Sequence, residues 1–183
     1  MARVSYPEPG TVGAKARDVF ARVPPLNVLQ MLLHSEPTFL AFMKMSKTIA
    51  VDLQLEPELR EMAILRVGAL SNCAYEVHQH ERLARQLGIS ETAIVASRTG
   101  GDSAGLSETQ RLVLLFTDEV VLKGRASDET FRPLVAGLSI AAVQELLITI
   151  GFYMTVCSFL LTFDIEIEDV PPAGRIDQPR ENA

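Results

Sequence analysis

Apolar residues recur along most of the chain at the three- and four-residue spacing of amphipathic helices. Polar helix-start and helix-stop signals separate these segments. A capping box from Ser107 to Gln110 opens a helix that Gly124 ends, and further helix starts are predicted at Ser90, Ser127 and Ser139. Strand-like alternation occurs only briefly, over residues 164–170, with no second strand to pair with. The sequence therefore predicts an all-α fold, a compact multi-helix domain with a central helix pair and a long buried apolar helix.

The central pair spans residues 58–89, as two helices that meet near Ser71 and Asn72. On a helical projection, Cys73, Glu76 and His80 fall within roughly 60° of one another, on an otherwise apolar face. The opposite face carries Tyr75, His78, Gln79, Arg82, Arg85 and Gln86. We therefore expect His80 to face the protein interior and His78 to face solvent.

Residues 146–163 contain no charged side chain and are long enough to span a membrane. Threonine and serine interrupt the apolar run, acidic residues flank it, and no lysine or arginine anchors either end. A helix that is apolar on all sides is otherwise one buried in a core or between subunits. We interpret the segment in that way and expect no membrane partner.

Length and composition predict one compact helical domain, because 183 residues with 48% hydrophobic content can bury a sizeable core. The proline- and glycine-rich residues 1–25 are expected to form an N-terminal arm. Residues 26–168 would form the helical domain, and residues 169–183 an extended C-terminal tail.

The charge pattern argues against a nucleic-acid partner. Most of the formal charge of −6 belongs to the residues from Asp164 onward, so the rest is nearly neutral, and no basic run is present. The two cysteines, Cys73 and Cys157, are too few for a secreted disulfide scaffold, and the N-terminus lacks a signal-peptide pattern. We therefore expect a cytoplasmic protein that acts on a small molecule.

Cys73 is expected in the first turn of its helix, where backbone N–H groups and the helix dipole favour a thiolate. The alternative is a small buried hydrophobic residue at a helix junction, because free cysteine is among the most buried residue types.

His80 is a candidate general acid or base, and a carboxylate on its second ring nitrogen would fix its tautomer. Glu76, one turn before it, and Glu61, on the preceding helix, are both candidates for that carboxylate. Either glutamate could instead form a structural ion pair with Arg66. Glu61, Glu76 and His80 could also ligate a metal, but the second glutamate–histidine unit of a di-iron bundle is missing. We predict neither a metal nor a cofactor.

Three sequence segments, PPLN at 24–27, LRVGALSNCAYE at 65–76 and HERLAR at 80–85, resemble the carboxymuconolactone decarboxylase and alkyl hydroperoxidase D superfamily. The resemblance extends from about residue 24 to 168. It implies an all-helical, alkyl hydroperoxidase D-like subunit in a homo-oligomer, a trimer, hexamer or dimer, with apolar helices buried between chains. The hydroperoxidase branch has a glutamate, a C-x-x-C pair and a histidine in a proton relay. These correspond to Glu61, Cys73 and His80, whereas Glu76 occupies the position of the second cysteine.

Because Glu76 replaces that cysteine, the two-thiol cycle of the hydroperoxidase branch cannot run in the same way, and Cys157 is the only substitute. The leading hypothesis is cofactor-independent decarboxylation or isomerisation of a small organic acid or lactone. In it, His80 moves the proton and Glu61 orients the histidine. Glu76 adds a second carboxylate, Cys73 lines the pocket and Arg66 binds a substrate carboxylate.

Two alternatives stay open. One is a thiol-dependent peroxidase with peroxiredoxin-type antioxidant activity, in which Cys73 is oxidised and Glu61 and His80 form the relay. The other is a non-catalytic binding or assembly protein that keeps the polar cluster as structure.

Overall fold

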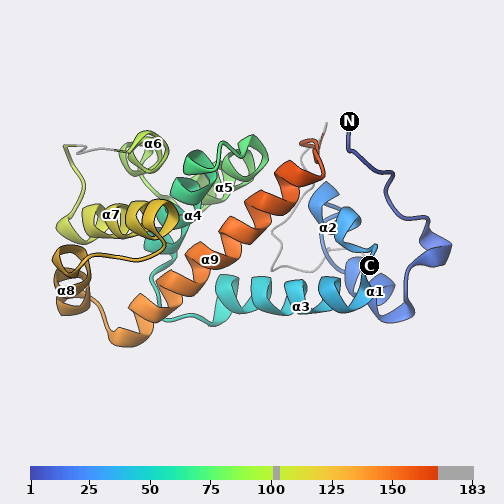
Figure 1. Ribbon diagram of the computed structural model, residues 1–183, viewed down its shortest axis with the longest axis horizontal. Helices are drawn as coiled ribbons and strands as arrows, with labels where there is room; N and C mark the ends of the chain where they lie inside the picture. Colours follow the sequence, from blue (N-terminus) through green and yellow to red (C-terminus); the bar gives the residue numbers. More distant parts are fainter. Residues whose placement is uncertain (101–103, 169–183) are drawn as a thin grey trace. The chain divides into compact units, whose positions relative to one another are not determined.

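A computed structural model describes residues 1–100 and 104–168, and every regular element within these ranges is helical (Figure 1). The all-α prediction is therefore confirmed. The chain divides into two compact units, one formed by Met1–Asp52 with Thr162–Ala183 and the other by Leu53–Leu161. This division falls inside the predicted 26–168 domain and groups the predicted N-terminal arm with the chain end. The predicted tail, 169–183, lies outside the described residues.

The first unit contains three helices, α1 (Ala14–Phe20), α2 (Asn27–Leu32) and α3 (Glu36–Lys47), with a 3-10 turn at Pro9–Thr11 and a π-helical turn at Thr48–Asp52. Its core includes Leu29, Met31 and Phe39, which are all fully buried. The end of the described chain joins this unit through polar contacts. The side chain of Arg3 pairs with Asp164, and the backbone N–H of Asn27 donates to the carboxylate of Glu168.

The second unit is organised around α4 (Pro57–Leu70), which packs against α5 (Ala74–Gln86), α6 (Glu91–Thr99) and α7 (Glu108–Lys123) (Figure 1). Because helices surround it, α4 buries side chains on nearly every side, including Met62 and Leu65. These two join a buried cluster with residues of α5, α6 and α7, namely Ala84, Ala93, Ile94, Ala96 and Leu114. Burial of α4 on all sides explains why charged residues of this helix must find partners inside the protein.

The predicted helix-start signals act as expected. Ser107 and Gln110 form the capping box of α7, which ends at Gly124 in the left-handed conformation. Ser90 caps α6, and Ser127 caps α8 (Asp128–Gly137). Ser139 accepts a hydrogen bond from the backbone N–H of Ala142 at the start of α9 (Ile140–Thr162). Serine side chains therefore cap the starts of α6, α7, α8 and α9, whereas α4 and α5 begin without a side-chain cap.

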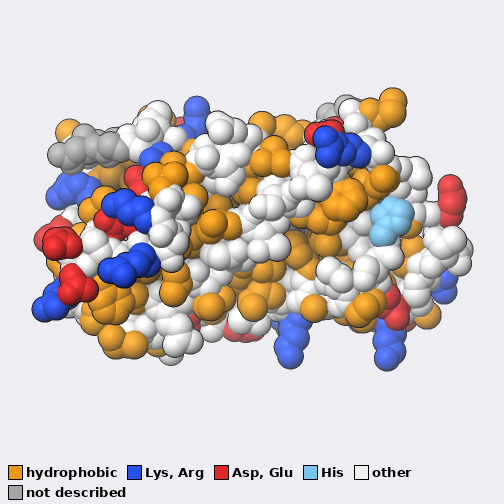
Figure 2. Space-filling model, viewed as in Figure 1, with side chains coloured by type: hydrophobic (Ala, Val, Ile, Leu, Met, Phe, Trp, Pro, Cys, Tyr) orange, Lys and Arg blue, Asp and Glu red, His pale blue; other side chains and the backbone are white. Residues whose placement is uncertain are grey.

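Within this chain, the long apolar helix α9 is buried on one face, and burial of its other face between subunits stays a prediction. Leu146, Ile150 and Cys157 are at most 1% exposed, whereas Leu147 and Ile148 are 44% and 47% exposed. By length and composition α9 is long enough to cross a membrane, and only 33% of its most apolar window is buried. Apolar side chains reach the surface along its course (Figure 2). The sequence identified an apolar helix but not how much of it the rest of the chain covers.

Asn72, in the turn between α4 and α5, tests how tightly this junction is specified. It is exposed and has a φ of 54°, a conformation that asparagine and glycine tolerate and β-branched residues do not. Asn72→Val should lower the free energy of unfolding by about 1–2 kcal/mol, and Asn72→Gly should change it little. Urea denaturation of both variants measures the difference. Equal stabilities would show that the junction does not need this conformation.

Candidate active site

Four charged side chains from α4 and α5 form one buried cluster, which we call the His80 cluster. His80 Nδ1 lies 2.6 Å from a carboxylate oxygen of Glu61, and His80 Nε2 lies 2.9 Å from one of Glu76. The other oxygen of Glu61 accepts a hydrogen bond of 3.2 Å from Arg60 Nε. All four residues are at most 5% exposed. The sequence left open which glutamate binds His80, and in the structure both do.

Close packing of α4 on α5 makes this contact between helices possible. Gly68 lies at the helix contact, where a Cβ atom would come within 3.1 Å of the side chain of Val77. With no side chain at Gly68, the two helices approach closely, and Glu61 reaches His80 across the gap. Glu76 and His80 are one turn apart on α5, so their side chains meet on the same face.

The electrostatics of the cluster keep His80 protonated. Burial opposes the charged imidazolium, but the carboxylates of Glu61 and Glu76 outweigh burial and raise the pKa of His80 to about 10. Burial likewise opposes the charged form of Glu61, yet His80 and Arg60 lower the pKa of its carboxyl group below the ordinary value. Near neutral pH the cluster therefore pairs two cations with two carboxylates. A protonated His80 donates hydrogen bonds from both ring nitrogens, which leaves neither nitrogen as a base or a metal ligand.

The two cysteines meet beside this cluster. Cys73 directly precedes α5 as its N-cap residue, Cys157 lies on α9, and the two free thiols are near enough to shift each other's pKa. The hydrogen bond from Cys157, helped by the N–H groups of Glu76 and Tyr75 and opposed by burial, lowers the pKa of Cys73. Its bond to Cys73, together with burial, raises the pKa of Cys157 well above the ordinary range, and the Ser71 hydroxyl opposes that rise. Cys73 is thus the thiol that ionises first.

Sequence reasoning missed two members of the site, Arg60 and Tyr153. The ring of Tyr153 lies edge-on to that of His80 with 5.0 Å between centroids. Burial and the nearby glutamates raise the pKa of Tyr153 well above its ordinary value, so the phenol stays neutral. Tyr153 and Cys157 are one turn apart on α9, a spacing that could have indicated a shared face. Arg60 had no signal beyond its position beside Glu61.

Arg66 does not belong to the site, which corrects the expectation that it binds a substrate carboxylate. Its guanidinium forms a two-point ion pair with Asp118 of α7 and pairs with neither Glu61 nor Glu76. Arg66 lies five residues after Glu61, about 140° around the helix, and so points away from His80.

Two further expectations concern the outer face of α5. His78 is exposed, as predicted, and His80 is buried. Tyr75 and Gln79 were assigned to the solvent side, but both are buried, at 5% and 6% exposure. Amphipathic periodicity assumes one buried face, whereas α5 is covered on a second side as well.

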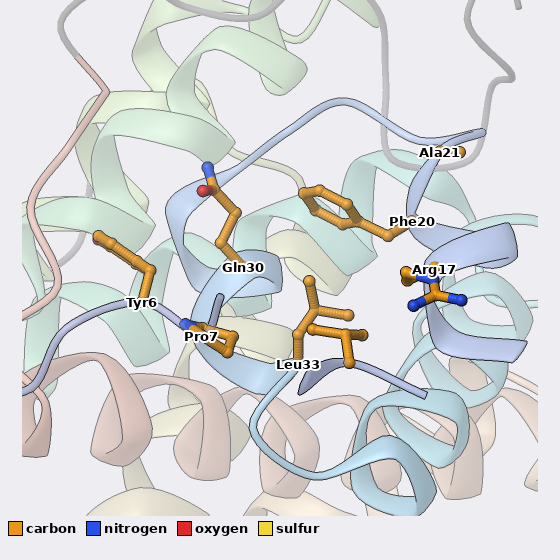
Figure 3. A pocket seen from close by; sticks show the side chains of 8 residues that line it. Tyr6, Pro7, Arg17, Phe20, Ala21, Gln30 and Leu33 are labelled. Atoms are coloured by element: carbon orange, nitrogen blue, oxygen red, sulfur yellow. The ribbon is translucent and has the colours of Figure 1, made fainter. Parts of the chain in front are cut away.

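Two cavities formed by described residues are lined by neither the cysteines nor the His80 cluster. One, of about 280 Å³, belongs to the first unit, where Tyr6, Phe20, Gln30 and Leu33 surround it and Arg17 lies at one side (Figure 3). The other lies between α7, α8 and α9. The His80 cluster and the two cysteines are therefore buried and lie apart from both of these cavities.

The raised pKa of His80 predicts a pH-dependent stability. The folded state holds the His80 proton up to about pH 10, whereas the unfolded chain releases it near pH 6.5. The stabilisation is complete below about pH 6.5 and is lost progressively as the pH rises towards 10. Glu76→Gln should shrink this decline, and the exposed-histidine control His78→Gln should not. Urea denaturation between pH 7 and 9.5 measures it, and parallel curves for all three proteins would contradict the charged cluster.

The carboxymuconolactone decarboxylase family model matches residues 36–119, a range that contains Glu61, Cys73, Glu76 and His80. No curated protein matches the chain in sequence.

Solved structures share the fold at low identity. An uncharacterised peroxidase-related protein from Ralstonia eutropha JMP134, described as an alkylhydroperoxidase AhpD core, is 19% identical with a TM-score of 0.78, over 92% of this chain and 93% of that chain. A peroxidase-related protein from Silicibacter sp. TM1040 is 16% identical with a TM-score of 0.77, over 96% and 94%. The debrominase Bmp8 is 17% identical with a TM-score of 0.77, over 91% and 92%. Residues 36–119 are thus similar to the carboxymuconolactone decarboxylase family, and the chain shares the fold of these solved structures.

Proposed function

We propose that the protein is a thiol-dependent peroxidase in which Cys73 is the reacting thiol and Cys157 the resolving thiol. The observation that carries the proposal is the interaction between these two thiols, one at the N-cap of α5 and the other on α9. One thiol of the pair has a lowered pKa and the other a raised pKa, so the thiolate forms at Cys73 while Cys157 keeps its proton. A reactive cysteine with a neighbouring resolving cysteine is the arrangement that reversible thiol oxidation requires.

The cycle balances with a hydroperoxide as oxidant and a dithiol as reductant. The Cys73 thiolate attacks the peroxide, a sulfur–oxygen bond forms, the O–O bond breaks, and the alkoxide takes a proton to leave as an alcohol. The Cys157 thiol then attacks the Cys73 sulfenic acid, which forms the disulfide and releases water. An external dithiol reduces the disulfide by exchange.

Burial of the thiols limits the substrate class. Cys73 and Cys157 are each 1% exposed. A bulky oxidant cannot approach sulfur atoms that are this enclosed unless the helices separate. Hydrogen peroxide or a small alkyl hydroperoxide is therefore the substrate class that fits best.

The His80 cluster supports the thiolate instead of serving as its base. The negative charge of Glu76 opposes ionisation of Cys73. His80 lies 2.9 Å from the Glu76 carboxylate and offsets that charge. Because both of its N–H groups are held by carboxylates, His80 is well placed to fix the charge and position of Glu76, and poorly placed to accept a proton at neutral pH.

The geometry favours the peroxidase over acid/base decarboxylation, which the sequence had ranked first. Acid/base decarboxylation was the leading hypothesis because Cys73 lacked a neighbouring cysteine in its own helix. Contact with Cys157 supplies that partner from another helix. Among the solved structures with this fold are proteins described as peroxidase-related, and a debrominase variant with one cysteine replaced by alanine that was solved with 2,3,4-tribromopyrrole.

Acid/base chemistry stays a second candidate because of one observation: both ring nitrogens of His80 contact carboxylates. A charged histidine of this kind suits protonation of a strongly basic carbanion, such as the one left by loss of carbon dioxide. In that case Cys73 would be dispensable.

The peroxidase proposal predicts distinct products for the two cysteine variants. One equivalent of hydrogen peroxide should remove two hydrogen atoms from the reduced protein by forming the Cys73–Cys157 disulfide. Cys157→Ser should add one oxygen as a sulfenic acid trappable by dimedone, and Cys73→Ser should keep its mass. Intact-mass and peptide spectrometry is unambiguous, because the chain has only two cysteines.

Turnover separates the two candidate functions. Peroxide consumption with dithiothreitol as reductant should fall at least a hundredfold in Cys73→Ser and persist in His78→Gln, a control for change on the same helix. Full consumption by Cys73→Ser, or oxidation of Cys157 before Cys73, would overturn the peroxidase proposal.

A further inference from the structure

A second, independent site candidate lies between α7, α8 and α9, which we call the α7–α9 pocket. It is a cavity of about 390 Å³ whose walls include Phe116, Phe131, Val143 and Leu147. Its volume is within the range of natural small-molecule sites, which are concave and mostly apolar with a few polar groups. Leu147 precedes Cys157 by ten residues of α9, or about 15 Å along the helix axis. The pocket is therefore separate from the cysteines and the His80 cluster.

The walls of this pocket expose apolar surface without a partner. Phe131 and Leu147 are 43% and 44% exposed, although aromatic and aliphatic side chains of this size gain free energy when they are covered. Such surface, gathered in a concavity instead of scattered singly, is typical of a binding site.

Two solvent-exposed polar side chains in the lining have no partner among the described residues. Arg125, in the turn between α7 and α8, forms no ion pair with any described residue, and Gln144 of α9 forms no side-chain hydrogen bond with one. Other arginines of this unit are paired, including Arg66 with Asp118 and Arg132 with Asp128. An unpaired guanidinium at an apolar cavity is a suitable donor for a carboxylate, to which it can form two parallel hydrogen bonds.

We infer that the α7–α9 pocket binds a small hydrophobic carboxylate, with an aliphatic or aromatic body between α7, α8 and α9. The carboxylate head accepts hydrogen bonds from the Arg125 guanidinium and the Gln144 amide. A ligand of this kind covers the exposed parts of Phe131 and Leu147 and neutralises the one lining cation in the same step. An uncharged ligand would cover the apolar surface but would leave the Arg125 charge unpaired.

The test uses the reduced full-length chain and two defined ligands. Decanoate and decan-1-ol share an alkyl chain and differ in charge, and each is titrated against protein with bound 1-anilinonaphthalene-8-sulfonate, followed by dye fluorescence. Leu147→Trp fills the pocket from a position that is already half exposed, so the fold should tolerate it. Arg125→Gln removes the lining cation, and Arg132→Gln is the matched control, an exposed arginine of α8 outside the lining.

The wild-type protein and Arg132→Gln should bind decanoate at least tenfold more tightly than decan-1-ol. Arg125→Gln should lose about tenfold in decanoate affinity and little in decan-1-ol affinity, and Leu147→Trp should lose both. Unchanged decanoate binding in Leu147→Trp, or equal losses in Arg125→Gln and Arg132→Gln, would overturn the inference. Sedimentation at the same protein concentrations reports the oligomeric state. An oligomer that binds neither ligand would also overturn the inference, because a second copy would then cover the pocket.

Discussion

The ion pairs of His80 with Glu61 and Glu76 are the constraint on which the central helix pair depends. Two carboxylates and two cations lie inside the protein, each at most 5% exposed. Charges this deeply buried are tolerated only when every one has a partner, because removal of one partner leaves another charge without compensation. Glu61 and Arg60 belong to α4, and Glu76 and His80 to α5, so the requirement for pairing fixes the register of one helix against the other.

These ion pairs also determine which residue of the site can react. A histidine held between two carboxylates stays positively charged and gives up the usual role of a base near neutral pH. The charge that it supplies offsets Glu76, whose backbone N–H faces Cys73. The reactive group that remains is the cysteine pair, with a thiolate favoured at the start of α5 and a protonated thiol on α9. Structural pairing at His80 and redox chemistry at Cys73 are thus two consequences of one arrangement.

Local signals made much of the fold predictable. A serine cap or a terminal glycine acts on the helix next to it in sequence, so it can be recognised without knowledge of tertiary contacts. Ser90, Ser107 and Ser127 identified the starts of their helices in this way. The inward direction of His80 followed from helical periodicity for the same reason. Cys73 was identified by the same projection and Glu61 by its place on the preceding helix, and the resemblance to a family then supported both.

What the sequence could not supply depends on contacts between distant elements. Nothing local to Cys157 indicates that α9 brings it to Cys73, and this contact changes the preferred function. Arg66 was a candidate ion-pair partner for Glu61, but the helix turns it towards Asp118, and the adjacent Arg60 pairs with Glu61 instead. The extent to which α9 is covered is likewise a property of its neighbours, since periodicity cannot distinguish an apolar face that is packed from one that is exposed.

The protonation state of His80 is the most direct test of this account. Carbon-13 and proton resonances of the His80 imidazole, assigned by comparison with a His80→Gln variant, report its titration in the folded protein. The account predicts an imidazolium that persists through pH 8, with a pKa of about 10. An ordinary midpoint near pH 6.5 would contradict it, because His80 would then be a conventional acid/base group and the carboxylates would not hold its charge.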